Sequence, residues 1–348
     1  MGDMVSAIQT EIELQREYLS GQPITTIYLG GGTPRLLPAE TIEDLVQHLE
    51  KHFQLDTNVE ITLEANPDDL SSSYLNNLRS IGINRLSIGI QSFNNSVLQW
   101  MNRAHDQNQA IRSFEQARNA GFDNLSLDLI YGIPLTSYSF EQDLGQALQL
   151  APDHISGYHL TIEPGTLFGH QLKKGLLTEV SEQTAAENFQ LAMTELKNHG
   201  FIHYEISNFC RPGKESKHNL GYWSGDSYLG VGPSAHSFNG DHRQYNISNN
   251  GRYLRSIQAG KIPCTREILT PEQRINEMIM LGIRTSDGVK LQLQAGNLNW
   301  NIATQSQDYL EQLLSTQLAR VQKNRLLLTD QGKLLADKIA EDLFLATD

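Results

Sequence analysis

The stretch RLSIGIQSFNNSVLQWMNRAHDQNQAIRSFEQARNAGFDNLSLDLIY, residues 85–131, decides the fold class. It opens with an apolar run at 85–91 and closes with another at 124–131, and each run predicts a buried strand. Residues 107–120, between them, predict a helix, because apolar residues recur there at helical spacing: Ala110, Phe114 and Ala117. A strand, a helix and a second strand in this order predict two parallel strands joined by a crossover helix.

The same alternation extends to both sides of this stretch. Further strands are predicted at 24–30, 59–65, 154–160 and 202–208. Further helices are predicted at 39–53, 139–150 and 181–199, and one around Leu75, Leu78 and Ile81. Repeated β/α alternation predicts an α/β fold with a parallel sheet.

Polar or glycine residues stand where several of these strands end. They are the glycine motif Gly30 to Thr33, Glu64, Gln91, Asp128 and His159. Because the carboxyl ends of parallel strands meet at one edge of a sheet or barrel, we expect a ligand site there. Asp128 lies between two leucines, so it needs a polar partner. Glu64 and Arg103 are open to two interpretations, as ligand-binding groups or as an ion pair at the rim.

Composition excludes several classes of protein. The chain has 348 residues, 39% of them hydrophobic, which is enough for one large domain and a smaller one. The net charge of −13 and the lack of a basic run argue against nucleic-acid binding. The polar N-terminus and the lack of a long apolar run predict no signal peptide and no transmembrane segment. Two distant cysteines, Cys210 and Cys264, favour a reducing cytoplasm.

The second half of the chain is less periodic. Residues 210–250 are rich in Gly, Asn, Ser and His and predict a long loop region. Thr270, Pro271 and Glu272 form a helix start. Residues 324–344 predict a short strand, a turn and a closing helix, as in a winged helix.

Five segments then carry a resemblance to a known family. They are YLGGGTP (28–34), LEANP (63–67), RLSIGIQSF (85–93), MNRAH (101–105) and DLIYGIP (128–134). In this order they resemble the strand ends of radical S-adenosylmethionine (SAM) proteins related to oxygen-independent coproporphyrinogen III oxidase. The resemblance implies a partial radical SAM parallel β/α barrel, similar to a TIM barrel, with a small C-terminal helical domain.

The resemblance also implies a SAM site. The matching positions are Gly31, Gly32 and Thr33 for the methionyl amine and carboxylate, and Glu64, Gln91, Arg103 and Asp128 for the remaining contacts. The chemistry agrees, because carboxylates accept hydrogen bonds from ammonium and hydroxyl groups, and a guanidinium pairs with a carboxylate in a planar fork.

The segments HYEISNFCRPGKESKHNLGYW (203–223) and YLGVGPSAHSF (228–238) resemble the HemW branch, which is associated with binding heme and delivering it to acceptor proteins. His218 to Trp223 match its HNxxYW motif. In that reading His218 is the ligand of the heme iron, while Tyr222 and Trp223 pack on the macrocycle. The alternative is that His218 caps a loop and both aromatic residues lie in the core. His203, His236 and Cys210 are weaker candidates.

Division into domains follows from these segments. We expect a radical SAM-type barrel without its first strand and cluster loop at 1–200, a HemW-like segment with the HNxxYW motif at 201–264, and a helical domain at 265–348.

One departure from the family is large. Members carry CxxxCxxC, whose three thiolates hold a [4Fe–4S] cluster that SAM also binds, and two distant cysteines cannot replace it. We expect a truncated chain rather than a natural variant, because loss of a barrel strand exposes a sheet edge.

Three functions follow as hypotheses. The first is a cytoplasmic heme chaperone whose partners are heme and heme-accepting proteins. The second is a radical SAM oxidase of a porphyrinogen, which requires the missing cysteines. The third is a cluster-free binding remnant. The sequence leaves open whether the chain is an enzyme, and upstream sequence encoding CxxxCxxC would separate the first two hypotheses from the third.

Overall fold

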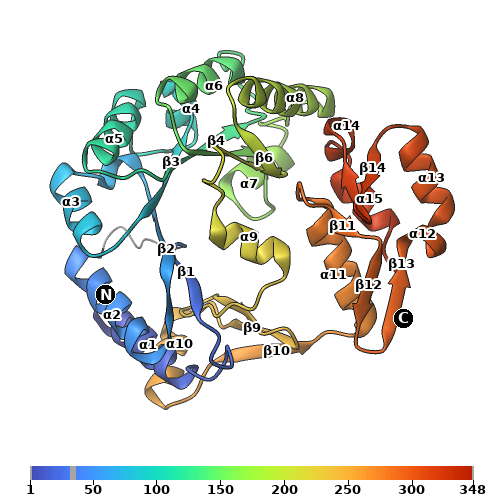
Figure 1. Cartoon of the computed structure of the whole chain (residues 1–348). Coiled ribbons are helices and arrows are strands. Elements are labelled where there is room, and N and C mark those ends of the chain that lie inside the picture. The colour runs from blue at the N-terminus through green and yellow to red at the C-terminus, as the bar shows by residue number, and fades with distance from the viewer. Residues whose placement is uncertain (1, 32–36, 347–348) are drawn as a thin grey trace. The chain divides into compact units, whose positions relative to one another are not determined.

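The computed structural model describes residues 2–31 and 37–346. Its largest sheet has the strand order β1-β2-β3-β4-β5-β7-β6 (Figure 1). The strands are β1 (Ile24–Leu29), β2 (Leu55–Ala65), β3 (Arg85–Gln91), β4 (Leu125–Tyr131), β5 (His154–His159), β6 (Ile202–Glu205) and β7 (Asn208–Cys210). Strands β2 to β5 pair in parallel in chain order, which confirms the α/β fold predicted from the alternation.

The chain divides into two compact units. The strand–helix unit comprises residues 28–36 and 61–216, and the composite unit comprises 1–27, 37–60 and 217–348. Each is described by itself below.

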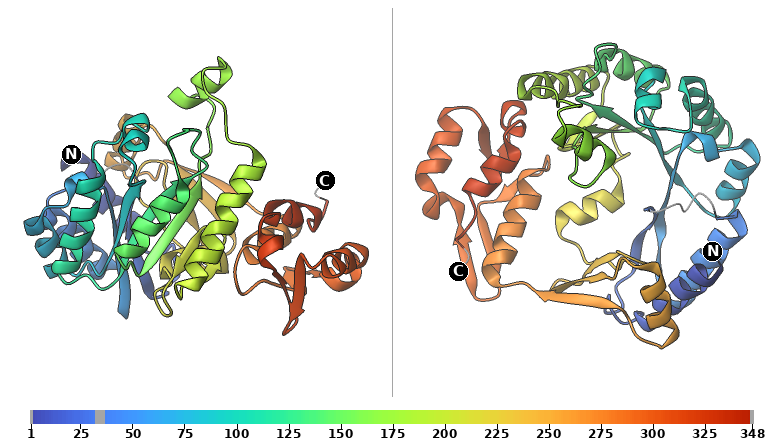
Figure 2. Two further views of the ribbon diagram at one scale, coloured as in Figure 1. Left: turned by 90° about the horizontal axis from the view of Figure 1, so that it is seen from above. Right: turned by 180° about the vertical axis from the view of Figure 1, so that it is seen from behind.

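In the strand–helix unit, helices follow the strands as predicted. They are α3 (Ser72–Ser80), α4 (Asn95–Trp100), α5 (Gln107–Asn119), α6 (Phe140–Gln149), α7 (Leu167–Lys173) and α8 (Glu182–Asn198). Figure 1 shows α3, α5, α6 and α8 along one face of the strands. Helix α7 projects from the layers in Figure 2, although Phe168 on α7 stacks on Trp100 of α4 with ring centroids 4.3 Å apart.

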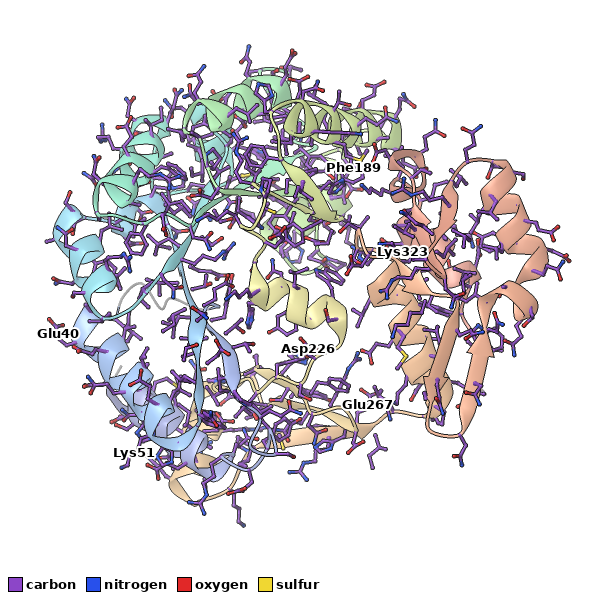
Figure 3. All side chains as sticks on the ribbon, in the orientation of Figure 1. Glu40, Lys51, Phe189, Asp226, Glu267 and Lys323 are labelled. Atoms are coloured by element: carbon purple, nitrogen blue, oxygen red, sulfur yellow. The ribbon has the colours of Figure 1, made fainter. Side chains whose placement is uncertain are left out.

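Helix α5 shows why the local sequence was informative. Asp106 caps its N-terminus in a reciprocal capping box with Gln109. The three apolar residues predicted to face inward, Ala110, Phe114 and Ala117, are each at most 1% exposed. Phe189 of α8, labelled in Figure 3, is buried in the same unit and stacks on Tyr131 of β4. Helix faces and the sheet therefore close one core in this unit.

The predicted single strand at 202–208 is wrong. Residues 202–210 form an antiparallel hairpin, β6 and β7. Its turn is fixed by Glu205, whose carboxylate accepts hydrogen bonds from the Ser207 N–H (3.2 Å) and the Asn208 side chain. The Ser-Asn pair is a turn signal that the apolar alternation of the segment concealed.

The composite unit contains the remaining helices and three small sheets. The helices are α1 (Gly2–Leu14), α2 (Ala39–His52), α9 (Lys217–Ser224), α10 (Asn250–Gln258), α11 (Pro271–Ile283), α12 (Ile302–Gln305), α13 (Gln307–Ser315), α14 (Asp330–Lys333) and α15 (Ala336–Asp342). The strands are β8 (His236–Phe238), β9 (His242–Asn246), β10 (Cys264–Ile268), β11 (Val289–Lys290), β12 (Gln292–Ala295), β13 (Leu298–Asn301), β14 (Ala319–Gln322) and β15 (Arg325–Leu328). Sheet orders are β10-β9-β8, β11-β15-β14 and β12-β13.

Helix α11 begins where the sequence predicted. Thr270 accepts a hydrogen bond from the Gln273 N–H in a capping box, and Pro271 is the first helical residue. The predicted strand, turn and closing helix near the C-terminus correspond to β15, α14 and α15. Among the described residues, no helix has both the length and the apolar character needed to cross a membrane.

The predicted loop at 210–250 is wrong, because it contains α9, β8 and β9. Helix α9 is bound at its start by a residue far away in sequence. Its first N–H groups, those of Lys217 and His218, donate instead to the carboxylate of Glu60 on β2, at 3.3 and 3.2 Å. A cap more than 150 residues away leaves no local signal.

Helix α1 is held in place by one buried carboxylate. Glu11 is 0% exposed, and its two oxygens accept four hydrogen bonds. The donors are Gly232 N–H (2.7 Å), Tyr253 Oη (2.6 Å), Asn246 Nδ2 (2.6 Å) and Gln15 Nε2 (2.9 Å). Three of the four come from residues 232–253, so this carboxylate joins the start of the chain to that segment.

We expect Glu11→Ala to lower the free energy of unfolding by about 3 kcal/mol, because it leaves several buried hydrogen-bond donors without their acceptor. Urea denaturation followed by circular dichroism measures this. Glu17→Ala is the matched control, since Glu17 is an exposed glutamate that follows the same helix. Equal urea midpoints for the two variants would contradict the role assigned to Glu11.

Candidate functional site

The first cluster in the strand–helix unit joins the ends of β1 and β2. The Tyr28 hydroxyl donates to Glu64 Oε1, and the Gly31 N–H donates to Glu64 Oε2 at 3.2 Å. A side chain at Gly30 would place its Cβ 2.5 Å from the Tyr28 ring and 3.0 Å from the Glu64 carboxyl carbon. Glycine is therefore required here for close approach, and burial together with Glu64 raises the pKa of Tyr28.

Asp128, on β4, has the polar partners that its sequence position required. Ser87 on β3 donates to its Oδ1 at 3.3 Å, and the Ser156 hydroxyl on β5 bonds to the same carboxyl group. Burial raises the pKa of Asp128 to about 6, the nearby Glu64 adds to the rise, and the serine hydrogen bonds and Arg85 oppose it. Its carboxyl group is therefore costly to ionise until a ligand supplies further donors.

The second cluster lies at the end of β3. Arg103 Nη2 donates to Asn66 Oδ1 at 2.8 Å and to the Gly89 carbonyl at 3.2 Å. A Cβ on Gly89 would lie 2.8 Å from the Gln91 side-chain amide. Gln91 has φ +69°, and the pairing of β3 with β4 is irregular between Ile88 and Gln91. A left-handed non-glycine residue beside a bulge is typical of a strand end shaped for binding.

Together these contacts address the ion-pair interpretation. Within the described residues, Glu64 accepts hydrogen bonds from Tyr28 and Gly31, and Arg103 donates to Asn66 and to the Gly89 carbonyl. His105 anchors the loop that carries Arg103, through a 3.0 Å contact between its Nε2 and the Ile90 carbonyl. Burial lowers the pKa of His105, which favours the neutral imidazole.

The structure brings together Gly31, Glu64 and Asp128 on one side, and Gln91 and Arg103 on the other. Gly32 and Thr33 lie outside the described residues. Sequence reasoning missed four residues that hold these groups: Tyr28, Asn66, Ser87 and Ser156. The signal available for them was alternation along the strands, which places Ser87 and Ser156 on the same face as Asp128.

The second candidate site is α9 in the composite unit. His218 is half-buried, its Nδ1 lies 3.0 Å from Thr26 Oγ1 on β1, and its Nε2 lies 3.1 Å from the Tyr222 hydroxyl. Its backbone N–H is the one bound by Glu60. Both ring nitrogens and the backbone thus fix the orientation of this imidazole.

Neither aromatic residue of the HNxxYW segment lies in the core. Tyr222 is 41% exposed and meets Tyr228 edge to face, with centroids 4.6 Å apart. Burial of its hydroxyl and the neighbouring Tyr228 raise the pKa of Tyr222 to about 12. Trp223 is half-buried, and the Arg284 guanidinium lies 5.5 Å from its ring centroid. An exposed tyrosine and a tryptophan under a cation form a surface that a flat ligand can contact.

The three weaker candidates for a heme ligand, Cys210, His203 and His236, differ in their burial and in their neighbours. Cys210 is fully buried, and burial raises the pKa of its thiol to about 12, so it is a protonated apolar group and no thiolate. His203 stacks on Phe209 with centroids 4.0 Å apart. His236 is exposed beside Tyr245. Cys264 is half-buried on β10, and with only these two cysteines the chain's residues do not fit a [4Fe–4S] cluster that needs three thiolates.

Comparison with known proteins gives the class of the fold first. Residues 4–146 match the model of the radical SAM superfamily, and residues 269–335 match that of the HemN C-terminal domain. A solved structure of the coproporphyrinogen III oxidase HemN from Escherichia coli, described as a radical SAM enzyme, superposes with a TM-score of 0.78. It is 26% identical, over 98% of this chain and 82% of that one. The fold is thus the partial-barrel α/β fold of radical SAM proteins.

Curated relatives narrow the class. The chain is 37% identical to the heme chaperone HemW of Bacillus subtilis, over 92% of this chain and 86% of the relative. It is 32% identical to the heme chaperone HemW of Mycobacterium tuberculosis H37Rv, over 97% of this chain and 85% of that relative. The chain belongs to the HemW family of radical SAM proteins.

The raised pKa of Asp128 predicts a pH dependence of stability. Folding raises this pKa from 3.8 to about 6, so the folded chain holds the proton more tightly than the unfolded chain. The stability that this group contributes is therefore present below about pH 4 and is lost as the pH rises through about 6.

Asp128→Asn keeps a neutral side chain that both serines can bind. We expect it to be more stable than the parent chain by about 1–3 kcal/mol at pH 7 and to lose this advantage near pH 4. Urea midpoints across this pH range measure the difference. Asp123→Asn, a change at an exposed aspartate, serves as the control. A constant difference between Asp128→Asn and the parent at all pH values would show that ionisation of Asp128 is not the cause.

Proposed function

We propose that this chain is a heme chaperone that binds heme at α9 and passes it to acceptor proteins in the cytoplasm. The observation that carries the proposal is the imidazole of His218, which is oriented by Thr26 and directed at the hydroxyl of the partly exposed residue Tyr222. Membership of the HemW family supports it, because the relatives are named as heme chaperones. Cytoplasmic placement is supported by two free cysteines.

The proposed heme contact uses His218 Nε2. When Nδ1–H donates to Thr26, Nε2 carries the lone pair that an iron requires. His218 Nε2 would bind the heme iron in place of the Tyr222 hydroxyl proton, and the Tyr222 and Trp223 rings would contact the macrocycle. The His218 imidazole is only half-buried. This suits a carrier protein, because heme must be able to leave the site as well as bind to it.

The strand ends form the proposed SAM site. Gly31, Gly32 and Thr33 are assigned to the methionyl group, and Glu64, Gln91, Arg103 and Asp128 to the rest of SAM. Support comes from the chemistry of these residues, because Glu64 and Asp128 are acceptors for ammonium and hydroxyl groups, and Arg103, whose guanidinium donates to Asn66, can pair with a carboxylate. SAM, when bound, supplies a sulfonium whose cleavage requires an electron, and this chain's residues hold no cluster to provide one.

We therefore derive no oxidase reaction for this chain, because its residues do not fit the cluster that the reaction requires.

We also propose the division of the chain predicted from its sequence, with a SAM-binding barrel at 1–200, a heme-binding segment at 201–264 and a C-terminal domain at 265–348.

His218→Ala is expected to weaken heme binding about tenfold or more, because the axial ligand is lost. A heme titration followed by the Soret absorbance measures the affinity, and circular dichroism checks the fold. His199→Ala, which removes an exposed histidine at the end of α8, is the matched control and should titrate like the parent. Parent-like heme affinity and spectra in the His218 variant would remove this residue from the heme site.

Glu64→Gln is expected to weaken SAM binding about tenfold, because a neutral amide replaces an anionic acceptor of nearly the same shape. Equilibrium dialysis with labelled SAM measures the affinity. Glu40→Gln, on the exposed side of α2, should leave the affinity unchanged. Binding by both variants at the parental affinity would argue against Glu64 as a SAM contact.

A further inference from the structure

Three side chains with metal-binding atoms meet between α1 and α2, away from α9 in sequence and unused by the proposed functions. They are Glu13 on α1 and His48 and His52 on α2. Glu13 Oε1 lies 3.4 Å from His48 Nε2 and 3.8 Å from His52 Nε2. One donor atom from each residue lies within 4.8 Å of the others. All three residues belong to the composite unit.

The spacing of the two histidines has a structural cause. Residues four apart in a helix project from the same face one turn apart, and the two imidazole centroids are 4.7 Å apart. This pair lies at the C-terminal end of α2, on either side of Lys51, which is labelled in Figure 3. A regular helix therefore holds both rings with little freedom, as a preorganised site requires.

The distances fit a transition-metal ion. Two ligand atoms bound to one tetrahedral zinc ion at 2.0–2.1 Å are about 3.4 Å apart. Glu13 and His48 already have this separation, Glu13 and His52 are 3.8 Å apart, and all three donor atoms lie within 4.8 Å of one another, so the side chains must move closer together to bind one ion. Two imidazoles and one carboxylate form the donor set of zinc sites that leave the fourth position to water.

Burial of the histidines points the same way. Each side chain is 16% exposed. His52 Nε2 is buried and has no hydrogen-bond partner among the described residues, which is an unfavourable arrangement for a polar nitrogen. His48 Nε2 lies 3.0 Å from the Gln9 carbonyl, and a metal ion would replace this contact. At His52 Nε2 a metal ion would replace no hydrogen bond among the described residues.

The surroundings favour a cation. Glu13 is 52% exposed, so solvent reaches the open coordination position. Apolar residues of the same segments pack together, among them Ile12 of α1, Leu49 of α2 and Phe53, which follows α2. Apolar surroundings strengthen the attraction between a carboxylate and a cation by lowering the local dielectric constant.

We propose that Glu13, His48 and His52 form a zinc site that clamps α1 to α2. Imidazole ligands select zinc and neighbouring transition metals over magnesium and calcium, which prefer oxygen ligands. Zinc at this position would bridge two helices that are otherwise joined by side-chain packing and by the contact between His48 and the Gln9 carbonyl. The site does not depend on the heme or SAM proposals.

The test uses the full chain, stripped of metal and titrated with ZnCl₂ in competition with a chromophoric zinc indicator. We expect about one tight equivalent per chain, and a tetrahedral visible spectrum when Co²⁺ replaces zinc. His52→Ala and His48→Ala should weaken zinc binding at least tenfold. His170→Ala, which removes an exposed histidine of α7, and His218→Ala should leave it unchanged.

Glu13→Gln guards against misfolded histidine variants, because this exposed side chain can change without loss of packing. It should weaken zinc binding while circular dichroism stays parental. Zinc should also raise the melting temperature of the parent chain and not that of His52→Ala. Parental zinc affinity in His48→Ala and His52→Ala, or loss of zinc binding only in His218→Ala, would overturn the proposal and place any zinc elsewhere.

Discussion

The structure around α9 depends on a single carboxylate, that of Glu60. This side chain is 5% exposed and accepts hydrogen bonds from the first two N–H groups of the helix. A buried anion is costly unless it is bonded, and the positive end of a helix supplies both donors and a favourable field. Lys217 strengthens the junction, because its Nζ donates to the Asn58 carbonyl at 2.8 Å. The start of α9 is thereby fixed against β2.

Because the start of α9 is fixed, the directions in which its side chains point are fixed as well. His218 comes immediately after the first capped residue, so its imidazole reaches Thr26 on the neighbouring strand. Tyr222, one turn further along, then contacts the Nε2 edge of the same ring. The HNxxYW spacing can thus be read as helix geometry, in which residues at i and i+4 share a face while the cap determines which way that face points.

Strong periodicity made the β/α alternation predictable, and position at a strand end made Glu64, Gln91 and Asp128 predictable as candidates, whereas Arg103 was a candidate only through the family resemblance. Their partners were not, because partners depend on register. Glu64 pairs with Ser87, and Asp128 pairs with Ser156, across parallel strands whose alignment no local pattern specifies. The same limit explains α9 and the β6–β7 hairpin, where a distant carboxylate and a two-residue turn overrode the local signal.

Helix α1 shows how one short element can serve two neighbours. Glu11 and Glu13 are two residues apart, so on a helix they point to nearly opposite sides. Glu11 is buried against residues 232–253 with every oxygen bonded, whereas Glu13 faces the histidines of α2. The first contact fixes the rotation of α1 about its own axis, and that rotation determines where Glu13 points. Any ion held by Glu13 therefore relies on a helix orientation that the Glu11 network has already set.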